Sequence, residues 1–367
     1  MNFFHFLAIF CFLNACSSFG TRPNELEKEN FKKSKHFNAE KGAFENRRPG
    51  LIEAMKKRTM SWGMVQDWFK AGMDRVPAGK LPEVRPDIAR FLEPSDDLKV
   101  IWFGHSSFLL NMDNKVILVD PVFSEAASPV SFMVQRFQKP VLELKELPKI
   151  DYLLISHDHY DHLDTESIKF FVDEDITFVT PLGVGSHLRG WGVPSEKIIE
   201  KDWWESEKLE GIEFIATPAQ HFSGRNGIYD NETLWASWVI KSENHNIYFS
   251  GDSGYDTHFK EIGNRFGPFE VAFLETGQYD KKWEEVHMPP EEAVIAFRDL
   301  RAKKYFPVHW GMFELALHPW FDPIERIFKL SKEQDLELIA PKIGAIVSIN
   351  ESDGIEKWWE SVPKEIK

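Results

Sequence analysis

Cysteine is almost absent from this chain of 367 residues, which contains only Cys11 and Cys16. Because both thiols lie near the amino terminus, the rest of the chain cannot build a disulfide framework. A long hydrophobic run is missing as well. Residues 3–13 are almost wholly apolar, but a helix that spans a bilayer needs about 20 such residues. This stretch is therefore too short to be a transmembrane helix.

An excess of basic residues is also lacking. The chain has 44 Lys and Arg against 58 Asp and Glu, which gives a formal net charge of −14. Such a protein gains nothing from the counterion release that drives binding to nucleic acids, so we expect no nucleic-acid partner. Hydrophobic residues make up 43% of the chain and include 13 Trp and 31 Phe. This composition is sufficient for a sizeable core.

The amino-terminal segment resembles an export signal. Residues 3–13 fit its apolar region, and residues 13–16 read Leu-Asn-Ala-Cys, which is similar to the cleavage box of bacterial lipoproteins. This pattern predicts a signal peptide over residues 1–16, lipidation of Cys16, and a membrane anchor in the cell envelope on the periplasmic or surface side. No Lys or Arg precedes the apolar region. An uncleaved start on a cytoplasmic protein is the alternative.

The remaining sequence divides into a polar part and a patterned part. Residues 17–48 are polar and predict a flexible tether, whereas residues 49–367 carry the strand and helix patterns of one domain. Early in this domain, Trp62 and Phe69 belong to a helical pattern of apolar residues. They fit either core packing or an apolar substrate path that touches lipid, since Trp favours interfaces.

A cluster of metal-ligating residue types follows an apolar run in the middle of the chain. Residues 152–155, Tyr-Leu-Leu-Ile, predict a buried strand. Directly after Ser156 comes the run His157, Asp158, His159, Tyr160, Asp161 and His162. Neutral imidazole and carboxylate suit zinc and related divalent ions. A turn after the strand would direct these side chains to one point, in a geometry that suits two adjacent ions better than one.

Further candidate ligands also follow predicted strands. Strand patterns over residues 213–217, 246–250 and 305–308 precede His221, Asp252 and His309, respectively. The sequence predicts additional strands and helices over residues 99–103, 107–111, 115–119, 164–171, 289–300 and 322–334. A mixture of strands and helices whose strand ends converge on one point predicts an α/β domain.

The pattern His-x-His-x-Asp-His at residues 157–162 resembles the metal-binding signature of the metallo-β-lactamase-fold hydrolases. The resemblance covers residues 45–348 and narrows to the branch that includes N-acyl-phosphatidylethanolamine-hydrolysing phospholipase D. Segments that carry it are Trp-Phe-Gly-His at 102–105, Asp-Pro-Val-Phe at 120–123, Thr-Pro-Ala-Gln-His at 217–221, Gly-Asp-Ser-Gly-Tyr at 251–255 and His-Trp-Gly at 309–311. It implies that residues 49–367 form an αββα sandwich of two mixed β-sheets flanked by helices.

The resemblance implies two zinc ions held by seven residues. One ion would be bound by three imidazoles, those of His157, His159 and His221. The second would be bound by the carboxylate of Asp161 and the imidazoles of His162 and His309. Asp252 would bridge the two ions. Each ion would keep a position open for water, as catalytic zinc sites do. Two adjacent ions would make hydroxide available near neutral pH. Asp161 and Asp252 are therefore also expected to serve catalysis.

Other residues are expected to support the metal ligands or the substrate. His105, Asp120 and Ser156 would orient ligating imidazoles through their second ring nitrogen. The resemblance places His287 beside the substrate headgroup, where it would take part in catalysis by donating to a phosphoryl oxygen. Val286 stands before it in place of a polar Gln, which leaves headgroup recognition open. Trp62 and Phe69 are the candidates for acyl-chain contacts.

Three functions fit these residues. The first is a zinc-dependent phosphodiesterase that cleaves phospholipids of the N-acyl-phosphatidylethanolamine type as a phospholipase D does. The second is a lactonase, or a hydrolase of other small esters or phosphoesters, since the same ligands serve such reactions. The third is a non-catalytic envelope lipoprotein, although a structural site would not need two open ions. The resemblance also implies a homodimer.

Overall fold

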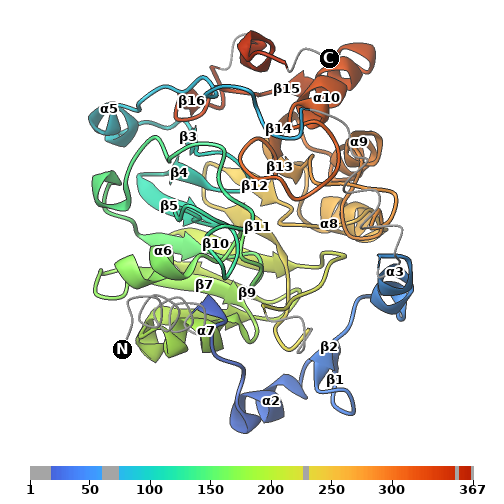
Figure 1. Ribbon diagram of the computed structural model, residues 1–367. Helices are drawn as coiled ribbons and strands as arrows, with labels where there is room; N and C mark the ends of the chain where they lie inside the picture. The colour runs from blue at the N-terminus through green and yellow to red at the C-terminus, as the bar shows by residue number, and fades with distance from the viewer. Residues whose placement is uncertain (1–17, 60–73, 226–230, 352–354, 365–367) are drawn as a thin grey trace, which may run out of the picture.

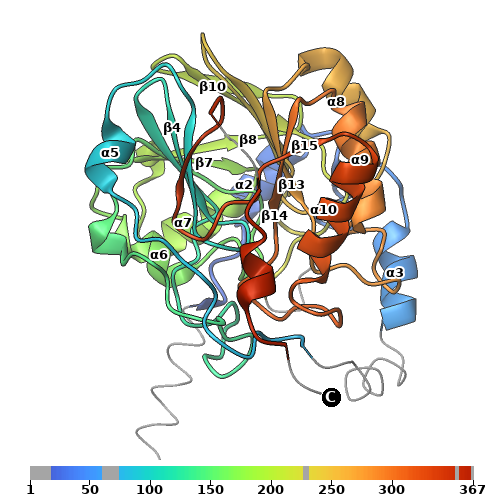
Figure 2. The same cartoon turned by 90° about the horizontal axis from the view of Figure 1, so that it is seen from above.

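Two seven-stranded β-sheets lie face to face, and helices cover their outer surfaces (Figures 1 and 2). The structure is a computed structural model, and it describes residues 18–59, 74–225, 231–351 and 355–364. Helices α6 (Thr165–Phe170) and α7 (Val184–Gly190) lie on one side, and α8 (His258–Phe266), α9 (Pro290–Asp299) and α10 (Asp322–Glu333) lie on the other. The predicted αββα sandwich of two mixed sheets is confirmed.

The first sheet has the strand order β16-β3-β4-β5-β6-β7-β8. The strands from β16 to β5 pair antiparallel, and those from β5 to β8 pair parallel. The bounds of these strands are β3 (Lys99–Trp102), β4 (Phe108–Met112), β5 (Lys115–Val119), β6 (Tyr152–Leu154), β7 (Thr177–Pro181), β8 (Ile198–Lys201) and β16 (Ile346–Ser348).

The second sheet repeats this plan in the order β9-β10-β11-β12-β13-β14-β15. Three antiparallel pairings are again followed by three parallel ones. Its strands are β9 (Ser206–Leu209), β10 (Ile212–Thr217), β11 (Ser237–Lys241), β12 (Asn246–Phe249), β13 (Val271–Glu275), β14 (Lys304–Val308) and β15 (Glu337–Leu338). The parallel part of each sheet directs several strand ends toward the same edge.

Aromatic side chains fill the space between the sheets. Phe108 of β4 stacks on Phe273 of β13 with ring centroids 4.5 Å apart, and Tyr152 of β6 meets Phe214 of β10 edge-on. The indole nitrogen of Trp238, on β11, donates to the carbonyl oxygen of Ile155 at 3.1 Å. This bond ties the second sheet to the first directly ahead of the His-x-His motif.

Helix starts follow the expected local chemistry. The side chain of Asp164 accepts a hydrogen bond from the backbone nitrogen of Ser167 and caps α6. Helix α9 begins at Pro290, where a missing backbone N–H costs nothing. Further short elements are α5 (Ile88–Leu92) and the 3-10 helices Leu144–Glu146, Ser195–Lys197 and Trp358–Ser361.

The predicted flexible tether over residues 17–48 is wrong for residues 24–46, which fold onto the domain. They form α2 (Glu25–Phe31) and a hairpin of β1 (Phe37–Asn38) and β2 (Ala43–Phe44). Phe31, Phe37 and Phe44 are buried and pack against one another, with centroids 5.1–5.7 Å apart. Burial of three aromatic rings outweighs the polar composition of the segment. Helix α3 (Leu51–Thr59) follows.

Three predicted functional residues fall outside the described part of the chain. Cys16 belongs to residues 1–17, and Trp62 and Phe69 belong to residues 60–73. Within the ranges that the structure does describe, no helix is long and apolar enough to cross a membrane.

Candidate metal centre

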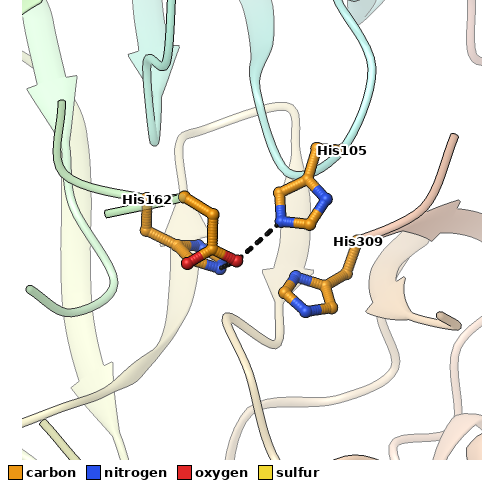
Figure 3. A group of neighbouring side chains, drawn as sticks. His105, His162 and His309 are labelled. Atoms are coloured by element: carbon orange, nitrogen blue, oxygen red, sulfur yellow. Dashed lines mark hydrogen bonds and ion pairs between the residues drawn. The ribbon is translucent and has the colours of Figure 1, made fainter. Parts of the chain in front are cut away.

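Polar side chains from both sheets converge where their strands end. His157 and its neighbours follow β6, His221 follows β10, Asp252 follows β12, and His309 follows β14 directly. His105 lies in the turn between β3 and β4. Figure 3 shows His105, His162 and His309 approaching one another from three separate segments of the chain. Crevices beyond the carboxyl ends of strands are the usual place for sites in α/β sheets.

Four of the predicted ligands form a first group. The Nε2 atom of His157 lies 2.9 Å from Nδ1 of His159, and Nε2 of His221 lies 3.1 Å from the same atom. One carboxylate oxygen of Asp252, Oδ2, lies 3.7 Å from Nε2 of His157 and 3.6 Å from Nε2 of His221. All four ligand atoms lie within 4.8 Å of one another. This spacing allows them to surround a single metal ion.

A second group gathers around the other oxygen of Asp252. Its Oδ1 atom lies 3.2 Å from Nε2 of His162 and 3.0 Å from Nδ1 of His309. Oδ2 of Asp161 lies 3.4 Å from the same His162 nitrogen. The two oxygens of Asp252 therefore face different groups, as a carboxylate that bridges two ions would require.

The chemistry of these residues fits a metal. Among the described residues, Nε2 of His162 and Oδ1 of Asp252 are buried and form no hydrogen bond although they lie only 3.2 Å apart, and buried polar atoms without a hydrogen bond call for a ligand or ion. Burial lowers the pKa of His157 and His221 well below the ordinary histidine value, and it lowers the pKa of His309 to about 3. Neutral imidazole is the form that binds metal.

Asp252 carries the negative charge that the centre needs. Burial acts to raise the pKa of this carboxyl group, but the neighbouring His162 and His309 outweigh burial and hold the pKa well below its usual value. The same holds for Asp161, where His162 and His105 oppose burial. Both carboxylates are therefore ionised at neutral pH.

Asp120 and Ser156 lie behind the imidazoles of two candidate ligands, His162 and His157. Oδ2 of Asp120 accepts from Nδ1 of His162 at 2.7 Å, and its Oδ1 accepts from the backbone nitrogen of Ser156 at 2.7 Å. The hydroxyl of Ser156 lies 2.9 Å from Nδ1 of His157. Both imidazoles are thereby held through the ring nitrogen that faces away from the centre.

His105 occupies a different place from the expected one. Its Nε2 atom bonds to Oδ2 of Asp161 at 2.8 Å, so it contacts a carboxylate and not an imidazole nitrogen. Its ring centroid lies 4.2 Å from that of His309. Since His105 groups with Asp161, His162 and His309 within ligand range, it either steadies Asp161 or belongs to the ligand set itself.

Three residues of the site adopt the left-handed backbone conformation. The φ angles are 52° at His105, 38° at Asp120 and 64° at His309. Side-chain-bearing residues rarely adopt such angles, and the strain is typical of functional sites. The turn after Asp252 also packs closely against the neighbouring chain. A Cβ on Gly254 would lie 1.9 Å from the carbonyl oxygen of Glu285, so only glycine fits there.

His287 lies at the edge of the site and is paired with Glu275, a residue that the sequence reasoning missed. The imidazole Nδ1 donates to Oε2 of Glu275 at 3.1 Å, and the His287 ring lies 5.0 Å from that of His221. Burial raises the pKa of Glu275 to about 7. Burial opposes the charged form of His287, but Glu275 outweighs it and raises the pKa. In the sequence, Glu275 is recognisable only as an acidic residue at the end of a predicted strand, and it belongs to no known motif.

Val286 does not face the substrate site. Its side chain is buried in a small cluster with Leu51, Ile52 and Met55 of helix α3. Its carbonyl oxygen lies 3.3 Å from Nδ1 of His221 and so holds the ring of a candidate ligand. An apolar residue at this position is therefore explained by packing against α3.

The fold and this centre together define a metal-dependent hydrolase. A family profile described as a β-lactamase superfamily domain matches residues 115–310. The chain belongs to this superfamily. An uncharacterised protein of Mycobacterium tuberculosis is 39% identical over 326 residues, which cover 87% of this chain and 86% of the relative.

Two further comparisons agree with this assignment. N-acyl-phosphatidylethanolamine-hydrolyzing phospholipase D 1 of Caenorhabditis elegans is 33% identical over 244 residues, which cover 62% of this chain and 68% of the relative. A solved metallo hydrolase of Ignicoccus hospitalis is 23% identical, with a TM-score of 0.52, over 68% of this chain and 97% of that one. The latter supports the fold alone.

Replacing Asp252 by Ala should weaken metal binding by more than about 100-fold, the upper end of the cost of losing an outer partner, because both groups lose a shared ligand. Metal analysis after dialysis against a weak chelator would measure this loss, and circular dichroism should show an intact fold. Asp175→Ala, whose side chain is 96% exposed, is the control. Unchanged metal content in Asp252→Ala would contradict the bridging role.

Proposed function

We propose that the protein is a zinc-dependent phosphodiesterase that hydrolyses phospholipids of the N-acyl-phosphatidylethanolamine type. The observation that carries this proposal is the position of His287 beside two ligand groups that share Asp252. Nδ1 of His287 is engaged by Glu275, which leaves Nε2 available to a substrate. The name of the Caenorhabditis elegans relative supports the same substrate class.

Each side chain has a role in this reaction. Two zinc ions, when bound, would supply Lewis acidity and an activated water. Asp161, Asp252 and the imidazoles would hold them, and Glu275 would keep His287 oriented and protonated. His287 would donate to a phosphoryl oxygen as charge develops there. Water adds to phosphorus, the bond to the ethanolamine oxygen breaks, and that oxygen takes up a proton, which yields N-acylethanolamine and phosphatidic acid.

An exposed apolar loop at the border of the site supports a lipid substrate. Phe132 is 75% exposed and Met133 is 50% exposed. At the base of this loop, Arg136 lies over the ring of Phe313, and Phe313 meets His105 edge-on. Large exposed apolar side chains on a loop whose base packs toward His105 favour contact with acyl chains or a lipid surface. Each methylene that leaves water contributes about 0.8 kcal/mol.

A product assay tests the proposal directly. Zinc-loaded protein should convert N-acyl-phosphatidylethanolamine in mixed micelles to N-acylethanolamine and phosphatidic acid, as followed by mass spectrometry, and chelation should abolish the reaction. His287→Ala should lower kcat about 100- to 10,000-fold, the usual contribution of a positioned proton donor, without changing metal content. Hydrolysis of lactones with no cleavage of phosphodiesters would reject this function and establish the lactonase alternative.

The Glu275–His287 pair predicts a characteristic pH dependence. Since Glu275 raises the pKa of His287, Glu275→Gln should lower that pKa. The alkaline limb of kcat, where His287 loses its proton, should then move to lower pH. A pH profile of kcat on the same lipid measures the shift, and metal content serves as the control. An unaltered alkaline limb would show that His287 does not act through its proton.

Anchoring at Cys16 completes the proposal, because a lipidated protein would meet phospholipid at a high local concentration. Cys16→Ser should move the protein from the membrane fraction to the soluble fraction after cell lysis. Mass spectrometry of the unaltered protein supplies the complementary measurement. An intact Met1 and an unmodified Cys16 would rule out this anchor without affecting the hydrolase activity.

A further inference from the structure

The amino-terminal segment reaches into the metal centre through Asn46. The side-chain nitrogen Nδ2 of Asn46 donates to the carbonyl oxygen of His221 at 2.7 Å. The backbone nitrogen of His221 donates back to Oδ1 of Asn46 at 3.1 Å. Asn46 is 8% exposed. One buried amide therefore satisfies both main-chain groups of a candidate metal ligand, although the two residues lie 175 positions apart.

The main chain of His221 is supported by a residue distant in sequence, whereas that of His159 is also supported from within its own motif. His157 and His159 lie in the compact run that ends at His162, where His162 and Leu163 both donate to the carbonyl of His159. His221 also lies outside the helices and strands, in the segment that follows the end of β10. Its ring is held from one side by the carbonyl of Val286, and its main chain is held by Asn46.

The same amino-terminal segment also contacts the chain after His221, at Arg225, Asn231 and Glu232. Beside residue 221, the carbonyl of Ser18 accepts two bonds from Arg225, at 3.0 and 2.8 Å. The backbone nitrogen of Phe44 donates to the carbonyl of Asn231 at 2.7 Å. Glu232 pairs with Arg22 and Lys28 at 2.5 and 2.9 Å. Residues 18–46, here called the strap, thus hold the His221 segment along its described length.

We infer that Asn46 is a positioning residue for the metal centre, so that this one side chain of the strap contributes to metal binding. A ligand whose main chain is fixed loses little conformational freedom when it binds, so part of the ordering cost of metal binding is already met by folding. The inference rests on the metal centre and not on the identity of the substrate, so the two can fail separately.

The test compares Asn46→Ala with Asn38→Ala, a control on β1 of the same strap. Asn38 also bonds through its side chain, to Glu45 and to the backbone nitrogens of Glu40 and Lys41. Zinc affinity would be measured by chelator competition on the full chain. Asn46→Ala should weaken the binding of one zinc about 10- to 100-fold, the range found when the partner of a ligand is lost. Asn38→Ala should leave the zinc affinity unchanged, because the bonds of its side chain stay within residues 38–45.

Hydrogen exchange in the metal-free protein provides a second readout. The amide of His221 should exchange faster in Asn46→Ala, because it loses its acceptor, and should be unaffected in Asn38→Ala. Faster exchange with unchanged zinc affinity would overturn the inference, as would an equal loss of affinity in both variants. If Asn46→Ala does not fold, Asn46→Ser decides by the same criteria, since its shorter polar side chain cannot bridge both groups.

Discussion

The candidate site depends on one buried carboxylate, Asp252, whose two oxygens face two different sets of imidazoles. A charged group without compensation in a protein interior is very costly, and Asp252 is only 3% exposed. His162 partly compensates, because Asp252 and Asp161 outweigh its burial and raise its pKa well above the ordinary value. In contrast, burial lowers the pKa of His157, His221 and His309 and disfavours their protonated forms. A metal cation bound between the carboxylate and the imidazoles would resolve both problems at once. The residues around Asp252 can be understood as the means of keeping this arrangement in place.

This arrangement is possible because the two sheets have the same order of antiparallel and parallel strand pairs. In each sheet, three antiparallel pairings precede three parallel ones, so β6, β12 and β14 end at one edge of the sandwich. The first sheet contributes Asp120 and the run from His157 to His162, and the second contributes His221, Asp252 and His309. Bonds between the sheets, such as that of Trp238 to Ile155, therefore fix the distance between the two halves of the centre.

Local sequence carries part of this information and tertiary contacts carry the rest. The ligand types follow apolar strands, and the compact motif at residues 157–162 is visible in the sequence, so an α/β domain with a cluster of metal-ligating residue types could be predicted. The division of the ligands between two ions came from the family resemblance and stays a prediction. Glu275 could not be found in this way, because only burial and the approach of His287 distinguish it from any acid at a strand end. The strap was misjudged since three Phe in a polar segment show no periodicity. Their burial follows from the surface they meet.

Val286 and Asn46 show how the surroundings of such a centre differ from the centre itself. A ligand is restricted by the geometry of the ion, whereas a neighbour must only present the correct main-chain or amide group. Val286 holds the ring of His221 through its carbonyl oxygen, which any residue supplies, and its side chain is free to match helix α3. A Val in place of Gln therefore reflects how α3 covers this loop and does not by itself define the headgroup. Substrate selection is then expected from His287 and from the apolar loop around Phe132, which border the centre without holding it.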